Sequence, residues 1–156
     1  MNKLSFLQDV DPTTRITLGI GVLVFHENKV LLEKREDCGL WCCPGGRMVA
    51  GEDVQATALR ELKEETNIDA TIQGLLGIYS NPQYGTIRKY SDDSFSQQII
   101  DVIFYATPES SEIKKSNESL DVEYLDLYNL PAEITPTIKH ILKDYKKLKP
   151  NFPIIK

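Results

Sequence analysis

Residues 46–68 constrain the fold of this 156-residue chain more than any other stretch. The segment from Asp53 to Thr66 contains neither proline nor glycine, and most of its residues favour a helix. Asp53 has the side chain of a helix N-cap. An apolar stripe recurs every fourth position and has to be buried. It consists of Val54, Ala58 and Leu62. The sequence therefore predicts a helix that packs one face on an apolar surface.

Three carboxylates share another face of this predicted helix. Glu61, Glu64 and Glu65 stand at positions i, i+3 and i+4. Like charges at this spacing repel by about 0.2–0.5 kcal/mol per pair, so the cluster needs a reason. One interpretation is a solvated face on which Arg60 and Lys63 relieve the charge. The other is a cation site, because hard divalent metals take carboxylate oxygens as ligands.

The residues around this helix resemble the signature of the Nudix hydrolases. The match runs Gly46, five residues, Glu52, seven residues, then Arg60-Glu61-Leu62-x-Glu64-Glu65-x-Asn67-Ile68. The preceding Trp41-Cys42-Cys43-Pro44-Gly45-Gly46 resembles the segment that leads into that signature. The family has Gly where this chain has Asn67. Either residue can leave a helix in the left-handed conformation, so the departure preserves the backbone geometry.

The resemblance implies a metal-dependent pyrophosphohydrolase. Such an enzyme cleaves a nucleoside diphosphate linked to another moiety X into a nucleotide and phosphorylated X. The resemblance also implies Mg²⁺ or Mn²⁺, held by the Gly46 carbonyl and by Glu61, Glu64 and Glu65. Arg60 would orient these carboxylates.

Other residue roles follow less directly from the resemblance. Glu52 is grouped with the catalytic residues, and we expect it to pair with Arg60 or to support the loop. The general base stays open, with Glu118 as a candidate outside the signature. Pro82 is placed as in relatives that act on ADP-ribose and nucleotide sugars, whereas Tyr84 is placed as in relatives that act on dinucleoside polyphosphates. We expect X to belong to ADP-ribose or a nucleotide sugar.

The rest of the chain predicts an α+β domain. Alternating or continuous apolar runs predict strands at 16–25, 30–33, 70–79, 98–106 and 122–127. A last helix begins at Thr135-Pro136, with Thr135 as N-cap and Pro136 as the first helical residue. The resemblance implies the Nudix αβα sandwich, a mixed β-sheet packed between helices. We expect residues 1–156 to form a single Nudix hydrolase domain.

Three segments are harder to assign. Residues 80–97 read as a long polar loop, in which Tyr84 and Tyr90 could stack on a base and Arg88 could meet a phosphate. The alternative is a solvated loop with its aromatic side chains tucked down. Residues 1–15 are expected to form a short helix or arm, and Pro150–Lys156 an irregular tail.

The amino-acid composition limits the kinds of partner that the chain is expected to bind. The net charge of −5 disfavours a nucleic-acid duplex or an anionic membrane and favours a small-molecule partner. No apolar run approaches the roughly 20 residues that span a bilayer, and no signal peptide is evident. Three cysteines suggest no disulfide framework, and the adjacent Cys42-Cys43 is poor spacing for zinc, so we expect reduced thiols in a cytoplasm. A homodimer stays open.

Two other classes of function also stay open. One is a catalytically silent Nudix-like domain that binds nucleotides or regulates, although the losses among the signature acids that mark such domains are absent here. The other is a structural or interaction protein whose acidic helix is plain surface. Titration with a divalent metal would separate the enzyme from the second class.

Overall fold

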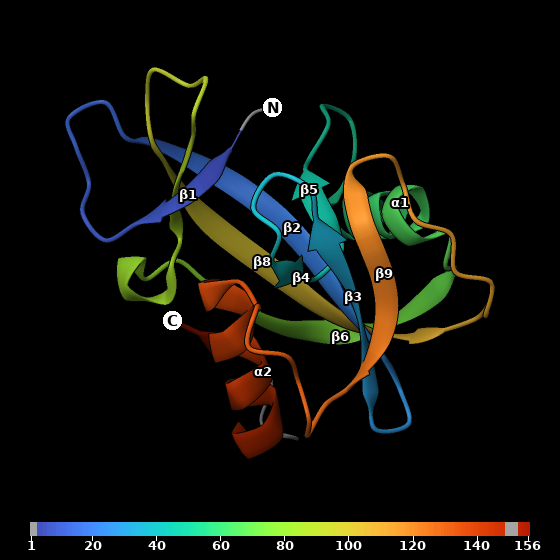
Figure 1. Ribbon diagram of the computed structural model, residues 1–156. Helices are drawn as coiled ribbons and strands as arrows, with labels where there is room; N and C mark the ends of the chain where they lie inside the picture. The colour runs from blue at the N-terminus through green and yellow to red at the C-terminus, as the bar shows by residue number, and fades with distance from the viewer. Residues whose placement is uncertain (1–2, 149–152) are drawn as a thin grey trace.

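The structure is a mixed β-sheet with a helix on each side (Figure 1). It is a computed structural model that describes residues 3–148 and 153–156. The strands are β1 (Leu4–Leu7), β2 (Arg15–His26), β3 (Lys29–Arg35), β4 (Trp41–Cys42), β5 (Gly45–Arg47), β6 (Ala70–Tyr79), β7 (Ile87–Tyr90), β8 (Gln97–Pro108), β9 (Ser119–Asp126) and β10 (Ile154–Ile155). The helices are α1 (Val54–Thr66), η1 (Pro82–Tyr84, a 3₁₀ turn) and α2 (Pro136–Leu148).

Two long strands form the centre of the sheet. β2 and β8 run parallel, in register from Arg15 opposite Gln97 to Val24 opposite Ala106. On its other edge β2 pairs antiparallel with β5 and then with β3, and β3 continues to β4 and β9. β6 and β7 both pair antiparallel with the far edge of β8. This topology brings β5, which begins the signature, against the middle of β2.

Local capping fixes both ends of α1. The Asp53 side chain accepts hydrogen bonds from the backbone N–H groups of Gln55 and Ala56, as an N-cap does. Asn67 ends the helix in the left-handed conformation, with φ 62°, and its N–H bonds the carbonyl of Lys63. The predicted helix and its left-handed exit are both confirmed.

Each helix covers its own core. Ala58 and Leu62 of α1 are fully buried against the face of the sheet that carries Ile20, Val22 and Phe104. The opposite face packs on α2 through a second apolar set. It includes Leu23, Val30, Leu32, Ile103, Ile138, Ile141, Leu142 and Tyr145. Because alternate residues of a strand point to opposite faces, β2 and β8 contribute to both cores.

The prediction of a polar loop over residues 80–97 is wrong. This segment contains η1 and then β7, which pairs with β1 and with the start of β8. The N-terminal segment is likewise a strand rather than a helix or arm, because Leu4 lies opposite Tyr90. Both strands are short, and their partners are distant in sequence, so neither shows a local pattern.

Two expectations near the C-terminus also change. Ile154–Ile155 of the predicted irregular tail form β10, which runs parallel to β6, while residues 149–152 lie outside the described part. Thr135 precedes α2, but its buried hydroxyl has no hydrogen-bond partner among the described residues. Its carbonyl accepts from Lys139 N–H instead. α2 therefore begins at Pro136 without the expected side-chain cap.

No helix within residues 3–148 and 153–156 combines the length and apolar character needed to cross a membrane.

Candidate active site

Arg60 is the centre of an ion-pair network on the exposed side of α1. Its Nε lies 2.6 Å from Glu52 Oε1, and its Nη1 lies 2.8 Å from Glu61 Oε1 and 3.1 Å from Glu64 Oε2. Its Nη2 also donates to the carbonyl of Arg47 at 3.2 Å. One guanidinium thus ties three carboxylates to the strand β5 that precedes the helix.

Glu52 supports the loop between β5 and α1. Besides Arg60, it accepts hydrogen bonds from the Val49 N–H and the Thr57 hydroxyl. The hydrogen bond from Arg60 is the main reason that the pKa of Glu52 falls to about 2, and the Val49 N–H and the Thr57 hydroxyl add to it. The structure places Glu52 in this loop network rather than among the residues that line the cavity described below.

Glu65 occupies a different environment on the same helix. Its Oε2 accepts a hydrogen bond from the Gly45 N–H at 2.8 Å. The pKa of Glu65 is raised to about 9, mainly by burial and next by the charge of Glu33. Glu33 is itself only 2% exposed, and burial raises its pKa although the Ser119 hydroxyl donates to it at 2.7 Å.

These two inner carboxylates lack a cation of their own. Within the described ranges, the ion pairs of the molecule do not include either Glu33 or Glu65. A buried carboxylate without a paired cation is costly. Such a group is therefore a candidate for chemistry rather than for stability.

Gly46 lies directly against Glu61. A Cβ at residue 46 would overlap the Glu61 carboxylate, so a larger residue would have to displace that side chain from its place beside Arg60. Of the four predicted ligands, Gly46, Glu61 and Glu65 lie at the junction of β5 and α1, and Glu64 is linked to Glu61 through Arg60.

Two adjoining cavities open beside these carboxylates. The first, of about 220 Å³, extends from Glu61 and Glu65 across β2 to Arg88 and Asp101. The second, of about 470 Å³, is lined mainly by charged side chains. Four residues line both cavities. They are Arg35, Glu65, Tyr90 and Glu118.

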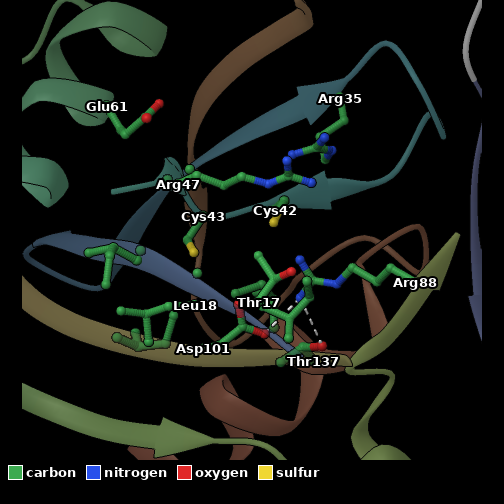
Figure 2. Close-up of a pocket in the computed structure, with 18 of the residues that line it drawn as sticks. Thr17, Leu18, Arg35, Cys42, Cys43, Arg47, Glu61, Arg88, Asp101 and Thr137 are labelled. Carbon is green, nitrogen blue, oxygen red and sulfur yellow. Dashed lines mark hydrogen bonds and ion pairs between the residues drawn. The ribbon is translucent and has the colours of Figure 1, made fainter. Parts of the chain in front are cut away.

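Three guanidinium groups face the first cavity, and Figure 2 shows them converging from β3, β5 and β7. Arg88 donates to Asp101 at 2.7 Å, and Arg47 donates to Gln97 Oε1 at 2.7 Å. Arg35 is paired with Asp37 through both oxygens of that carboxylate. Arg47 is the one of the three whose side-chain partner is neutral, so its charge is the least compensated.

The predicted substrate residues separate into two groups. Arg88 and Tyr90 line the first cavity, and the Tyr90 hydroxyl lies 3.4 Å from Arg35 Nη2. Tyr84 instead packs against His140, with ring centroids 4.4 Å apart, and is absent from the residues that line either cavity. Figure 2 shows the Arg88 guanidinium turned toward Asp101 and Thr137 at the floor of the cavity.

Several residues of the site were missed by the sequence analysis. Asp101 is a buried acid that interrupts an apolar run in β8, and this contrast was the available signal, whereas the buried Glu33 is followed directly by Lys34 and Arg35 and gave a weaker one. Arg35 and Arg47 gave no comparable signal, because isolated arginines beside turns are common on surfaces.

Comparison with known proteins identifies the class. The NUDIX domain model matches residues 15–145. The ADP-ribose pyrophosphatase of Methanocaldococcus jannaschii is 32% identical over 130 residues, which covers 81% of this chain and 71% of that protein. The chain therefore belongs to the Nudix family, and it is a hydrolase that acts on phosphoric anhydride bonds.

Solved structures agree on the fold. A NUDIX hydrolase from Nitrosomonas europaea matches with a TM-score of 0.69 and 24% identity, covering 91% of this chain and 80% of that one. A bifunctional NMN adenylyltransferase/ADP ribose pyrophosphatase from Francisella tularensis, solved with AMP and a manganese ion, matches with a TM-score of 0.57 and 21% identity. This match covers 85% of this chain and 38% of the Francisella tularensis chain. The expected Nudix αβα sandwich is confirmed.

The donor set fits the divalent metals that the family uses. Carboxylate and carbonyl oxygens are the ligands that such hard cations prefer. In the described parts of the chain, no three acidic, His or Cys side chains are gathered into a metal-binding group. Arg60 contacts one oxygen each of Glu61 and Glu64, and the Gly45 N–H contacts one oxygen of Glu65. A carboxylate has two oxygens, so each of these three side chains keeps a second one for a cation.

Proposed function

We propose that this protein is a metal-dependent pyrophosphohydrolase that cleaves a nucleoside diphosphate linked to another moiety X, with ADP-ribose or a nucleotide sugar as its substrate class. The observation that carries the proposal is one continuous cavity that joins Glu61 and Glu65 to Arg35 and Arg88. A substrate of this class carries anionic phosphates beside a polar group. It therefore needs acidic side chains that can hold a cation and arginines that can bind phosphate, in the same cavity. The similarity to an ADP-ribose pyrophosphatase supports the same substrate class.

The cation would be Mg²⁺ or Mn²⁺, held by the carboxylates of Glu61, Glu64 and Glu65 and by the Gly46 carbonyl. When bound there, such a cation neutralises phosphate oxygens and lowers the pKa of a coordinated water. Its positive charge would also offset the unpaired charge of Glu65. The oxygens of Glu61 and Glu64 would then be shared between the cation and Arg60.

The protein's own residues would orient this assembly. The Gly45 N–H fixes one oxygen of Glu65, and Arg60 fixes one oxygen each of Glu61 and Glu64. Glu52 in turn fixes Arg60. Preorganised charges of this kind act without a reorganisation cost during the reaction.

The guanidinium groups would bind the phosphates. Arginine matches phosphate oxygens with paired N–H donors, and Arg47 and Arg88 face the cavity on either side of β2. Tyr90 offers an aromatic face to the base or the sugar. The two adjoining cavities provide room for both parts of such a substrate.

The reaction would be attack of water on phosphorus. A new phosphorus–oxygen bond forms, the anhydride bond to the second phosphate breaks, and the products are a nucleotide and phosphorylated X. Glu118 is the candidate general base, because it lines both cavities together with Glu65. Its exposed position allows it to accept a proton from water.

Three broader proposals accompany the activity. We propose a cytoplasmic location, supported by three free thiols and no disulfide among the described cysteines. We also propose that residues 1–156 form one domain. Assembly as a homodimer stays a prediction that sedimentation equilibrium can test.

A substrate screen tests the proposal. ADP-ribose, nucleotide sugars, dinucleoside polyphosphates and nucleoside triphosphates are each incubated with the protein and Mg²⁺ or Mn²⁺, and the products are read by mass. We expect ADP-ribose or a nucleotide sugar to be cleaved fastest into two monophosphates, with no turnover in excess chelator. Binding of these compounds without cleavage under any metal would instead indicate a catalytically silent domain.

A further inference from the structure

Two adjacent thiols line the first cavity, and the proposed hydrolysis uses neither of them. Cys42 ends β4, and Cys43 and Pro44 connect it to β5. Both belong to the cavity lining, and Figure 2 shows their sulfur atoms on the wall between β2 and the arginines. Cys43 is 6% exposed, while Cys42 is partly buried, so a small molecule that enters the cavity reaches Cys42 first.

The surroundings of Cys42 favour its thiolate. A hydrogen bond from the Cys43 thiol is the main cause that lowers the pKa of Cys42, and the cations Arg35 and Arg88 lower it further. Burial and the charge of Glu33 act in the opposite direction. Thiolates rather than thiols are nucleophiles, and neighbouring arginines are a common reason for their stabilisation.

Cys43 has the complementary character. Its hydrogen bond to Cys42 is the first cause that raises the pKa of Cys43 well above its ordinary value, and burial is the second. Of the two thiols, Cys42 therefore loses its proton more readily than Cys43. A reactive thiolate next to a second thiol is the arrangement found in redox-sensitive cysteine pairs.

Cys38 provides an internal comparison. It is partly buried, but it lines neither cavity. Burial raises the pKa of Cys38, and the charge of Asp37 adds to this effect. The same chain thus contains one thiol whose pKa is raised by its surroundings and one whose pKa is lowered by them.

We propose that Cys42 and Cys43 form a peroxide-reactive dithiol at the wall of the substrate cavity. The Cys42 thiolate attacks one oxygen of a peroxide, the O–O bond breaks, and the other oxygen leaves and takes a proton to become water. Cys42 is then a sulfenic acid. The Cys43 sulfur next displaces the hydroxyl group from Cys42, which forms a disulfide and a second water. The two thiols are oxidised by two electrons, and the peroxide is reduced.

The disulfide would be strained and easily reversed. Consecutive Cα atoms are about 3.8 Å apart, whereas ordinary disulfides join Cα atoms about 4.4–6.8 Å apart. Strained disulfides are more reducible, so a small thiol would restore the dithiol. Oxidation would therefore be a reversible mark rather than permanent damage.

The same bond would disturb the hydrolytic site. The backbone that follows Cys43 carries the Pro44 carbonyl, which accepts from Val22 N–H at 3.0 Å, and the Gly45 N–H, which holds Glu65 at 2.8 Å. Closing a ring at Cys42 and Cys43 moves this backbone. We therefore expect oxidation to reduce hydrolysis by at least about tenfold, the lower end for misplacing a catalytic group.

The direct test is a peptide mass map of the wild-type protein after mild treatment with hydrogen peroxide. We expect the peptide with Cys42 and Cys43 to lose the mass of two hydrogen atoms and to regain it in dithiothreitol, while Cys38 stays reduced. In Cys43→Ser, dimedone should trap a sulfenic acid at Cys42. Oxidation of Cys38 at an equal rate, or no change at Cys42, would overturn the proposal. This readout needs no substrate, so it is independent of the proposed hydrolysis.

Matched cysteine variants test whether oxidation of Cys42 and Cys43 causes the loss of hydrolysis. Each variant is compared with its own untreated sample, so differences in basal activity cancel. Cys38→Ser should lose activity in peroxide as the wild type does and recover in dithiothreitol, whereas Cys42→Ser should keep its starting activity. An equal fractional loss in Cys42→Ser would show that peroxide acts elsewhere and would contradict the proposal.

Discussion

The acids at helix α1 divide into two groups with different partners. Arg60 pairs with Glu52, Glu61 and Glu64, so these carboxylates have a cation supplied by the chain itself. Glu65 is close enough to Glu33 for its pKa to be raised by that charge, and within the described residues its hydrogen-bond partner is the Gly45 N–H rather than a cation. One short segment thus contains acids that Arg60 compensates and an acid that it does not.

This difference separates stability from function. Arg60 organises the loop through Glu52, Glu61 and Glu64, of which Glu61 and Glu64 are also proposed ligands of the cation. Burial strongly raises the pKa of Glu65, and within the described residues no ion pair offsets that burial. An acid in that position is explained when a cation from solution completes the site. The experiments below test this contrast, beginning with the largest effect.

Neutralising Glu65 should separate activity from stability. In Glu65→Gln the amide oxygen can still accept from the Gly45 N–H, but the charge that would hold a cation is lost. We expect turnover to fall by at least ~10²-fold, as for the loss of one well-placed catalytic charge. The melting temperature at neutral pH should stay equal or rise, because the fold no longer has to keep protonated a carboxyl group that is ionised in the unfolded chain.

Glu64→Gln is the control from the exposed side of the helix. This variant should lower turnover by a similar factor, since Glu64 is also a proposed ligand. Its melting temperature should not rise, because the Glu64 side chain is 59% exposed and its replacement relieves no burial. Full activity in either variant would remove that carboxylate from the proposed site.

Asp101 gives a second comparison with Glu65, because it is a buried acid that is paired with a cation, Arg88. Its side chain is 10% exposed and accepts from Arg88 at 2.7 Å. Arg88→Met would leave Asp101 buried and unpaired, so we expect a loss of about 2–3 kcal/mol in the free energy of unfolding. Adding Asp101→Asn should recover part of this loss, and denaturant titration measures both. Equal losses in the single and double variants would show that the ion pair itself contributes little.

Helix α1 ends at Asn67, which leaves the helix in the left-handed conformation. Asn67 has φ 62°, a conformation that a β-branched residue strongly resists. We expect Asn67→Val to cost about 1 kcal/mol or more and Asn67→Gly to be tolerated. The Asn67 amide also donates to the Glu112 carbonyl, so Gly loses one hydrogen bond while it gains backbone freedom. Equal denaturation midpoints for Val and Gly would contradict the left-handed exit.

The contribution of Glu52 to the stability of the fold should be smaller, and it should depend on pH. The fold lowers the pKa of Glu52 to about 2, so folding favours its ionised form. Its contribution to stability is therefore present above the ordinary pKa of 4.5 and is lost as the pH falls toward about 2. Melting temperatures of the wild type and Glu52→Gln should differ at neutral pH and converge in acid. A constant difference across this range would show that the Glu52 charge has no such role.

The sequence predicts the carboxylates of α1 better than the groups that surround them. α1 has its caps, its stripe and its carboxylates within one segment, so local spacing was sufficient to find Glu61, Glu64 and Glu65. β1 and β7 were missed because Leu4 and Tyr90 meet across most of the chain, and β10 is only two residues long. Non-local pairing leaves no local pattern in strands as short as these.

The cavity was missed for the same reason. Arg35, Arg47 and Arg88 come from three separate strands, and only the order of β3, β5 and β7 around β2 and β8 brings them together. Glu33 only ends the apolar run of β3, whereas Asp101 carried a usable signal, since it interrupts an apolar run in β8. Their pairing with Ser119 and Arg88 could be known only from the structure.

The most direct measurement is hydrolysis of ADP-ribose in water labelled with heavy oxygen, with Mg²⁺ present or removed by a chelator. We predict AMP and ribose phosphate as products, one heavy oxygen on a phosphate of one product, and no turnover in the chelator. Turnover that persists without a divalent metal, or label on a carbon of the sugar, would contradict a cation site built on Glu61, Glu64 and Glu65.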